Sequence, residues 1–318
     1  MKKIITILLM ILLVGCATAK KDIKDLSIVV PSGAPSLAFY NETRNDNFNT
    51  SDAASILPEL KSDSGSDIIV IDTVNGIKAL NAGANYKLAA TITFGNFYIA
   101  STGLDSDGVM NDGDYIVLFS QNATPDLLFH SIYENGLDSN IHYVSAVSDA
   151  ATCLIKGINI SDENRQADEE PYVDYVMIAE PALSMALGKN DNASVYANIQ
   201  DLYEELSRSS DEYPIMQASL FVSNRLDNEQ VDEYLAKLEN SINDLLKNPE
   251  LFKGTLGNIP NEEVKEIFGV PNMNITTKVL TENSINLGFK KAYDYKEAID
   301  RYIAIYGMEN TSEEIYYK

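Results

Sequence analysis

The sequence has few of the residues on which much enzyme chemistry depends. Its 318 residues include two histidines, two cysteines and no tryptophan. Two cysteines cannot build a disulfide framework, and two histidines leave little for a histidine-rich metal site or a histidine-based catalytic centre. The sequence also has no Gly-x-Ser-x-Gly, phosphate-binding-loop or paired metal-ligand motif. We therefore expect no catalytic residues, no metal site and no cofactor.

Positive charge is also scarce. The chain has 24 Lys and Arg against 47 Asp and Glu, which gives a formal net charge of −23. A nucleic acid or the anionic face of a bilayer repels a surface of that sign, so we expect neither as a direct partner. The composition, 45% hydrophobic and 22% charged, is otherwise typical of globular proteins, and the length allows one large domain or two medium ones.

The amino-terminal segment indicates export. Two lysines precede an apolar run over residues 4–14, which is shorter than the roughly 20 residues needed to span a bilayer. The run ends at Gly15-Cys16, which resembles the lipobox of bacterial lipoproteins. The resemblance implies a signal peptide over residues 1–15, lipid attachment at Cys16, and a tether over residues 16–25. The alternatives are an uncleaved anchor and a simple secretory signal.

Short β-branched runs alternate with helical segments in the first part of the mature chain. Such alternation favours α/β layers with largely parallel strand pairing. Strands are predicted over residues 26–30, 66–71, 86–93 and 97–101, and helices over residues 34–40 and 74–82.

A second α/β unit follows a turn-rich acidic stretch at residues 105–114. Its predicted strands are residues 115–120, 141–144 and 172–178, and its predicted helices are residues 126–135 and 148–156. Residues 215–222 are predicted to carry the chain back to the first unit, after which a helical pattern continues to the end. We expect lobe 1 to comprise residues 26–112 and 216–318, and lobe 2 to comprise residues 113–215.

Five stretches carry a family resemblance. They are residues 30–36, 90–101, 122–126, 179–182 and 314–317. In their order and spacing they resemble the NMT1-like (nitrate, sulfonate and thiamine-precursor) group of ABC-importer substrate-binding lipoproteins, which have the type II periplasmic-binding-protein fold. The similarity covers residues 26–318. It implies an α/β protein of two lobes with a ligand cleft between them.

The same resemblance implies a role and partners. A monomer on the outer face of the bacterial cytoplasmic membrane, anchored by lipid on Cys16, would bind one small molecule and deliver it to an ABC transporter permease. Closure of the two lobes would hide the ligand from water, and no chemistry would be required.

Strand ends with small and polar residues are the candidate ligand site. Ligands of open α/β sheets bind beyond the carboxyl ends of the strands, and helices that begin there have backbone N–H groups without helical partners. We expect these N–H groups to be free for polar ligand atoms. The expected ligand-binding residues are Ser32, Gly33, Ala34, Pro35, Thr73, Asn75, Phe94, Asn96, Tyr98, Asn122, Thr124, Glu180 and Tyr213.

The charge of the segments assigned to the cleft bears on the ligand. These segments are residues 31–40, 72–77, 94–100, 120–124, 179–183 and 213–218. None of them contains Lys or Arg, whereas a strongly charged oxyanion is usually held by Arg. Asp72 and Glu180 would oppose an anion, and aromatic residues are plentiful. We therefore expect a neutral or cationic organic ligand, such as a heterocyclic vitamin or precursor that stacks on Tyr or Phe.

Two alternatives stay open at this point. One is a small oxyanion, such as a sulfonate or nitrate, held by backbone N–H groups. The other is an enzyme or adhesin built on the same fold. Against an enzyme, His130 is expected to be a partnered residue on a helix, and Cys153 lies in an apolar stretch that favours a buried, inert thiol over a nucleophile.

Overall fold

A computed structural model describes residues 21–103, 108–121, 123–133, 140–160, 172–207 and 215–318. Three residues of interest, Cys16, Asn122 and Tyr213, lie outside the described residues. Within the described part, no helix is both long enough and apolar enough to cross a membrane.

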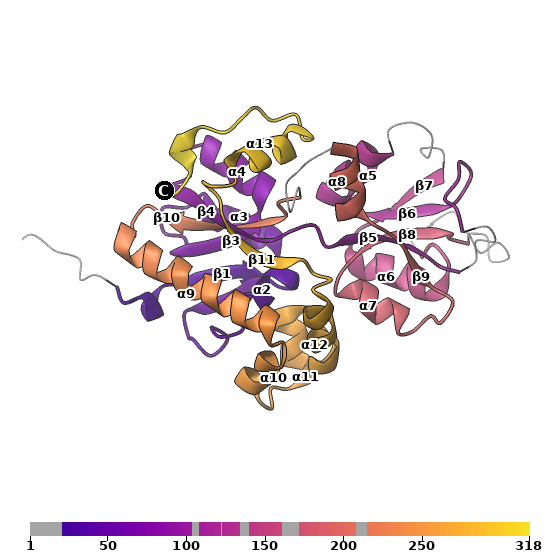
Figure 1. Cartoon of the computed structure of the whole chain (residues 1–318), viewed down its shortest axis with the longest axis horizontal. Coiled ribbons are helices and arrows are strands. Elements are labelled where there is room, and N and C mark those ends of the chain that lie inside the picture. Colours follow the sequence, from indigo (N-terminus) through magenta and orange to yellow (C-terminus); the bar gives the residue numbers. More distant parts are fainter. Residues whose placement is uncertain (1–20, 104–107, 122, 134–139, 161–171, 208–214) are drawn as a thin grey trace, which may run out of the picture.

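Two α/β units lie side by side, each built around one sheet (Figure 1). The first sheet has the order β11 (Leu287–Lys291), β4 (Tyr86–Thr93), β10 (Ala218–Ser223), β3 (Ile68–Asp72), β1 (Ile28–Pro31) and β2 (Phe48–Ser51). The second sheet has the order β7 (Ile141–Val144), β6 (Ile116–Phe119), β8 (Tyr175–Ala179), β5 (Phe97–Ser101) and β9 (Ser194–Asn198). The α/β fold class expected from the sequence is confirmed.

The chain crosses between the sheets earlier than expected. Strand β4 ends in the first sheet at Thr93, and β5 begins in the second sheet at Phe97, paired with β8 and β9. The crossing therefore lies at residues 94–96, and the expected boundary after residue 112 is corrected. Only three residues separate the two strands, and nothing in the sequence pattern signals that they belong to different sheets. The return crossing ends at Ala218, where β10 enters between β3 and β4.

The strand pairing is mixed. Strand β1 pairs parallel with β2 and β3, and β6 pairs parallel with β7 and β8. The two strands that follow a crossing, β5 and β10, are antiparallel to both neighbours. Parallel neighbours need a crossover connection, usually a helix, and a strand that enters directly from the other sheet has none. The expectation of largely parallel pairing is wrong for this reason.

Helices cover both faces of each sheet (Figure 1). From here on, lobe 1 is the unit around the first sheet and lobe 2 is the unit around the second sheet. Those of lobe 1 are α2 (Ala34–Leu37), α3 (Ala53–Leu60), α4 (Thr73–Asn81), α9 (Asn228–Lys247), α10 (Glu250–Leu256), α11 (Asn261–Phe268), α12 (Met273–Glu282) and α13 (Lys296–Ala304), with the short 3-10 helices η1 (Ile23–Asp25) and η3 (Glu313–Ile315). Those of lobe 2 are α5 (Thr124–Ile132), α6 (Val147–Lys156), α7 (Ala182–Leu187) and α8 (Ile199–Ser207).

Helix α9 shows how the sequence pattern produces these layers. Asp227 caps its first turn by accepting the backbone N–H of Gln230 at 2.9 Å. The apolar residues at three- and four-residue spacing are buried, as the pattern predicted. They are Val231, Tyr234, Leu235, Leu238, Ile242 and Leu245.

The packing of α4 on the first sheet gives a stability prediction. A Cβ atom at Gly76 would lie 2.0 Å from Cζ of Phe221, which is fully buried in β10. We expect Gly76→Ala to lower the free energy of unfolding by about 1–3 kcal/mol, because the ring has to move in a packed interior. Urea unfolding measures the effect. Gly254→Ala on α10 is the control: its Cβ would meet nothing within 4 Å, so no loss is expected. Equal midpoints for Gly76→Ala and the parent would contradict the packing.

Candidate ligand site between the two sheets

A cavity of about 350 Å³ lies where the ends of strands from both sheets meet. This volume is near the lower end of the range for small-molecule sites, roughly 300–1,000 Å³. Its walls come from strand ends, the crossing segments and the first turns of helices. They comprise Pro31, Ser32, Gly33, Ala34, Pro35, Asp72, Asn96, Phe97, Thr124, Val147, Ala179, Glu180, Pro181, Ala182, Gln217, Ala218 and Gly269.

The structure brings many of the expected site residues together in this cavity. They come from the loop after β1, the first crossing, the start of α5 and the end of β8. They are Ser32, Gly33, Ala34, Pro35, Asn96, Thr124 and Glu180. Segments more than 140 residues apart in sequence thus share one cavity, as expected for strand ends in an open α/β fold.

Four other expected residues do not line the cavity. Phe94 is fully buried in the core. The Thr73 hydroxyl is buried 2.6 Å from that of Ser219, and the Tyr98 hydroxyl donates to the Ser284 carbonyl at 2.7 Å. Asn75 is exposed on α4. Sequence alone placed these residues near strand ends but could not tell which way their side chains point.

The loop after β1 is held by a distant helix. The Gly33 N–H donates to the Ile267 carbonyl at 3.4 Å, and the Ser36 hydroxyl donates to the same carbonyl at 2.7 Å. The Ser32 hydroxyl donates to the Glu266 carbonyl, so it is already engaged within the protein. A Cβ at Gly269 would lie 3.1 Å from the Gly33 Cα, and the two backbones approach closely because both residues are glycine.

Hydrogen bonds between the two crossings fix the floor of the cavity. The backbone N–H of Asn96 donates to Oε1 of Gln217 at 3.1 Å, and its Nδ2 donates to the Glu180 carbonyl at 2.9 Å. The Glu180 N–H donates to the Asn96 carbonyl at 3.0 Å, and the Gln217 N–H donates to the Thr93 carbonyl at 3.0 Å. Asn96 and Gln217 therefore lie side by side on opposite crossings.

Among the lining residues that the structure describes, two carboxyl groups supply the only formal charge. Oδ1 of Asp72 accepts the Asn75 N–H at 2.9 Å, and its Oδ2 accepts the Thr124 hydroxyl at 3.1 Å, which joins the two lobes. Burial raises the pKa of Asp72, although these two donors act in the opposite direction. Burial also raises the pKa of Glu180, whose two oxygens accept the N–H and hydroxyl of Ser184 at 3.0 and 2.8 Å.

Several backbone N–H groups that we expected to be free are used within the protein. The N–H of Gly33 and that of Thr73 donate to backbone carbonyls, those of Ile267 and Gln217. The N–H of Asn75 donates to Oδ1 of Asp72. The expectation of free N–H donors is therefore wrong at these positions, and the cavity offers fewer donors to an anion.

The aromatic residues near the strand ends differ in where they lie. Phe97 lines the cavity. Phe39, Tyr40, Phe94, Tyr98 and Tyr175 are buried in the cores of the lobes, and Tyr172 is exposed. Large rings satisfy the hydrophobic demand of the sheets first, and sequence alone does not separate that role from stacking on a ligand.

The residues considered for catalysis are a partnered histidine and a buried thiol. Nε2 of His130 lies 3.1 Å from the Tyr143 hydroxyl and 3.2 Å from Oδ1 of Asp126. Cys153 is a free, fully buried cysteine, and burial raises the pKa of its thiol. Both outcomes match the sequence expectation. Among the described residues, no group of three or more His, Cys, Asp and Glu could hold a metal ion.

Two lining residues were not expected from the sequence: Val147, the first residue of α6, and Gly269, which follows α11. Gln217, which directly precedes the return strand, lies in the segment 213–218 that was assigned to the cleft, but it was not singled out as a ligand-binding residue. Nothing in the sequence signals Gly269, because its closeness to Gly33 depends on how α11 packs.

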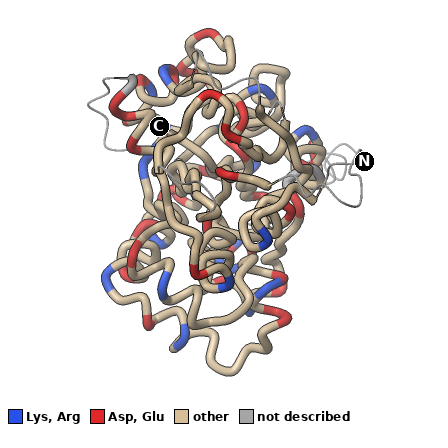
Figure 2. Tube along the Cα trace, turned by 90° about the vertical axis from the view of Figure 1, so that its right-hand side faces the viewer, with Lys and Arg blue, Asp and Glu red and all other residues tan. Residues whose placement is uncertain are grey.

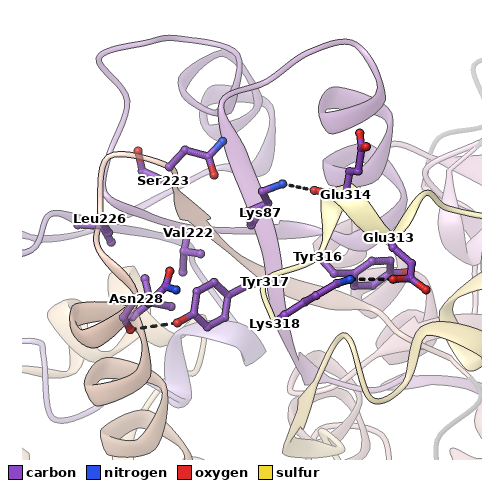
Figure 3. A pocket seen from close by; sticks show the side chains of 12 residues that line it. Lys87, Val222, Ser223, Leu226, Asn228, Glu313, Glu314, Tyr316, Tyr317 and Lys318 are labelled. Carbon is purple, nitrogen blue, oxygen red and sulfur yellow. Dashed lines mark hydrogen bonds and ion pairs between the residues drawn. The ribbon is translucent and has the colours of Figure 1, made fainter.

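A second cavity, of about 540 Å³, lies at the opposite end of the first sheet (Figure 3). It surrounds the carboxyl-terminal segment and is lined by lobe 1 alone. The Lys87 ammonium donates to the Glu314 carbonyl, Lys318 pairs with Glu313 at 2.7 Å, and the Tyr317 hydroxyl donates to the Asn228 carbonyl at 3.0 Å. These groups already pair with one another, and a ligand there would not touch lobe 2. We therefore take the inter-lobe cavity as the candidate site.

In the view of Figure 2, Asp and Glu positions are spread along the Cα trace among fewer Lys and Arg positions. The excess of negative charge is thus not confined to the cavity, and it adds to the potential that Asp72 and Glu180 create locally.

No protein-family model and no curated protein matches the sequence. Several solved structures resemble it. One, described as an ABC transporter from Parabacteroides distasonis, has a TM-score of 0.70 at 16% identity, over 92% of this chain and 98% of that one. A ligand-binding component of an ABC-type import system from Staphylococcus aureus, with zinc bound, has a TM-score of 0.62 at 10% identity, over 92% and 96%.

The periplasmic aliphatic sulphonate binding protein SsuA from Escherichia coli is a further structural neighbour. Its TM-score is 0.60 at 13% identity, over 91% of this chain and 90% of that one. At these identities the likeness concerns the fold alone. The chain therefore has the two-lobed periplasmic-binding-protein fold that its sequence resembles.

The raised pKa of Asp72 gives a prediction about pH. Because ionisation is harder in the folded state than in the unfolded chain, the free energy of unfolding should fall as the pH rises from about 4 through the raised pKa. Asp72→Asn keeps an acceptor for Asn75 and a polar partner for Thr124 but does not ionise. We expect its stability, measured by urea unfolding of the ligand-free protein, to fall less over this range. The exposed Asp294→Asn is the control, and an unchanged pH dependence in Asp72→Asn would contradict the assignment.

Proposed function

We propose that this chain is an extracytoplasmic solute-binding lipoprotein of an ABC importer. It captures a small organic ligand, neutral or cationic, in the cavity between its lobes and delivers it to a permease. The fold supports the binding role, since solved neighbours with this fold include import-system components. The further elements of the proposal are the kind of ligand, the lipid anchor and the absence of catalysis.

The chemistry of the cavity carries the proposal about the ligand. Its described lining has two carboxyl groups, no Lys and no Arg. Both carboxyl groups have raised pKa values because burial costs them hydration, and a ligand with N–H donors or positive charge would replace the lost water. Phe97 adds an apolar wall against which a planar or aliphatic ligand can pack.

The proposed mechanism is closure of the lobes around the ligand. The cavity has walls from both sheets, so a ligand that touches both walls binds the closed arrangement more tightly than an open one. The hydrogen bond from Thr124 to Asp72 already joins the lobes at this place. Closure would hide the ligand and present a joined surface to the permease.

A small oxyanion is the alternative ligand. The Escherichia coli neighbour is a sulphonate-binding protein, and this alternative would place an anion among backbone N–H groups of the same cavity. The cavity opposes it, because Asp72 and Glu180 repel an anion and several of the expected N–H donors are occupied. An enzyme or an adhesin on the same fold is the remaining alternative, and turnover of a bound compound would reveal the enzyme.

A ligand screen tests the proposal. The purified mature chain is heated with vitamins, nucleobases, amines, sulfonates and nitrate, and hits are confirmed by calorimetry. We expect one small organic molecule to raise the unfolding temperature, because a ligand at 100 times its Kd adds about 2.7 kcal/mol to the folded state. Asp72→Asn should weaken binding of a cationic hit.

The outcomes of the screen separate the alternatives. A response to sulfonate or nitrate alone would contradict the charge argument and favour the oxyanion reading. Steady conversion of a hit into product would favour an enzyme. No response to any compound would contradict the solute-binding role.

The lipid anchor is tested separately. In a bacterial host supplied with labelled fatty acid, we expect label on the parent chain and none on Cys16→Ala, which should leave the membrane fraction. Cys153→Ala is the matched control, because that thiol is buried and should not affect lipid attachment. Equal membrane retention of the parent chain and Cys16→Ala would contradict the anchor.

A further inference from the structure

Two amide side chains at the floor of the cavity are each fixed at one end by the protein. Nδ2 of Asn96 donates to the Glu180 carbonyl, and Oε1 of Gln217 accepts the backbone N–H of Asn96. Oxygen and nitrogen of an amide are told apart by such partners. Reversing Asn96 would set its Oδ1 against a carbonyl, and reversing Gln217 would set its Nε2 against an N–H. Both orientations are therefore determined.

The opposite ends of the two amides have no partner. Oδ1 of Asn96 is buried without a hydrogen bond, in a residue that is only 3% exposed. Among the described residues, no hydrogen bond engages Nε2 of Gln217 either. Both residues line the inter-lobe cavity. A buried acceptor without a partner costs free energy, about 1–3 kcal/mol, which a ligand donor can recover.

We propose that Asn96 and Gln217 form hydrogen bonds to one planar edge of the ligand, which carries an N–H donor beside a carbonyl or ring-nitrogen acceptor. The inference rests on the proposed function and narrows its ligand class. Oδ1 of Asn96 accepts the N–H of the ligand, and Nε2 of Gln217 donates to its acceptor. Primary carboxamides, lactams and amino-substituted nitrogen heterocycles have such an edge.

The fixed positions of the two residues make the site selective for a donor beside an acceptor. Asn96 lies on the first crossing and Gln217 at the end of the second, and the hydrogen bond of 3.1 Å between them fixes their relative placement. A compound with two donors or two acceptors on its edge satisfies only one of the amides. A site that leaves a buried polar group unpaired rejects such a compound strongly.

Matched pairs of compounds, with and without the N–H donor, test whether the ligand needs this donor–acceptor edge. The ligand screen includes nicotinamide with N,N-dimethylnicotinamide, benzamide with N,N-dimethylbenzamide, and 2-pyridone with 1-methyl-2-pyridone, besides the wider set. We expect the compounds that bind to carry the edge, and methylation of the edge nitrogen to weaken binding by about tenfold or more.

The substitution Gln217→Glu tests the proposed donor on the protein, Nε2 of Gln217. The substitution keeps an oxygen that accepts the Asn96 N–H, so the crossing stays in place, but it replaces the Nε2 donor with an acceptor. We expect the Kd of the edge-bearing ligand to rise about tenfold or more. Asn240→Asp, an amide-to-acid change at an exposed position on α9, is the control and should leave the Kd unchanged.

The results distinguish this inference from the function on which it rests. If the best ligand lacks a donor–acceptor edge, or if its methylated partner or Gln217→Glu binds as well as the original pair, the inference is wrong and solute binding stands. Equal loss in Gln217→Glu and Asn240→Asp also overturns it. If no compound of any kind binds, the proposed function itself fails, and the inference fails with it.

Discussion

The hydrogen-bonded contact between the two crossing segments is the constraint on which the site depends. Asn96 and Gln217 come from crossings more than 100 residues apart, and backbone groups of Asn96 and Glu180 tie the first crossing to the end of β8. These bonds satisfy most of the polar groups that the crossings bury. Oδ1 of Asn96 is left without a partner, and Asn96 and Gln217 both line the cavity, so the joint between the lobes also forms part of the wall of the site.

The fold and the choice of ligand depend on different residues. Neighbours with this fold include a sulphonate-binding protein, yet the cavity here is lined by carboxyl groups and an unpartnered amide oxygen, without a cation among its described residues. Sites are placed on a fold by a few side chains, and those side chains set the charge that a ligand can carry. Shape similarity at 10–16% identity therefore concerns the fold alone, and the proposal about the ligand rests on the residues that line the cavity.

Local patterns in the sequence predicted most of the strands and helices that lead into the cavity. Strands β4, β5 and β7 have the bounds that alternation of apolar residues indicated, and α9 buries its predicted stripe. The strand β2 was missed because Phe48–Ser51 is polar and only partly buried. At the site, Thr124 and Glu180 followed from strand ends, whereas Phe94 and Tyr98 turned out to serve the core. Which face a side chain takes depends on packing across the crossing, and sequence spacing does not contain it.

The burial of polar groups around the cavity explains how binding and closure can be linked. Asp72 and Glu180 are held where ionisation is unfavourable, and the Asn96 oxygen is buried without a partner. An open arrangement would return these groups to water, whereas a closed one needs a ligand to replace that water. The bond from Thr124 to Asp72 offsets part of this cost across the lobes. In the proposed mechanism, a ligand that supplies donors would stabilise closure through its higher affinity for the closed arrangement.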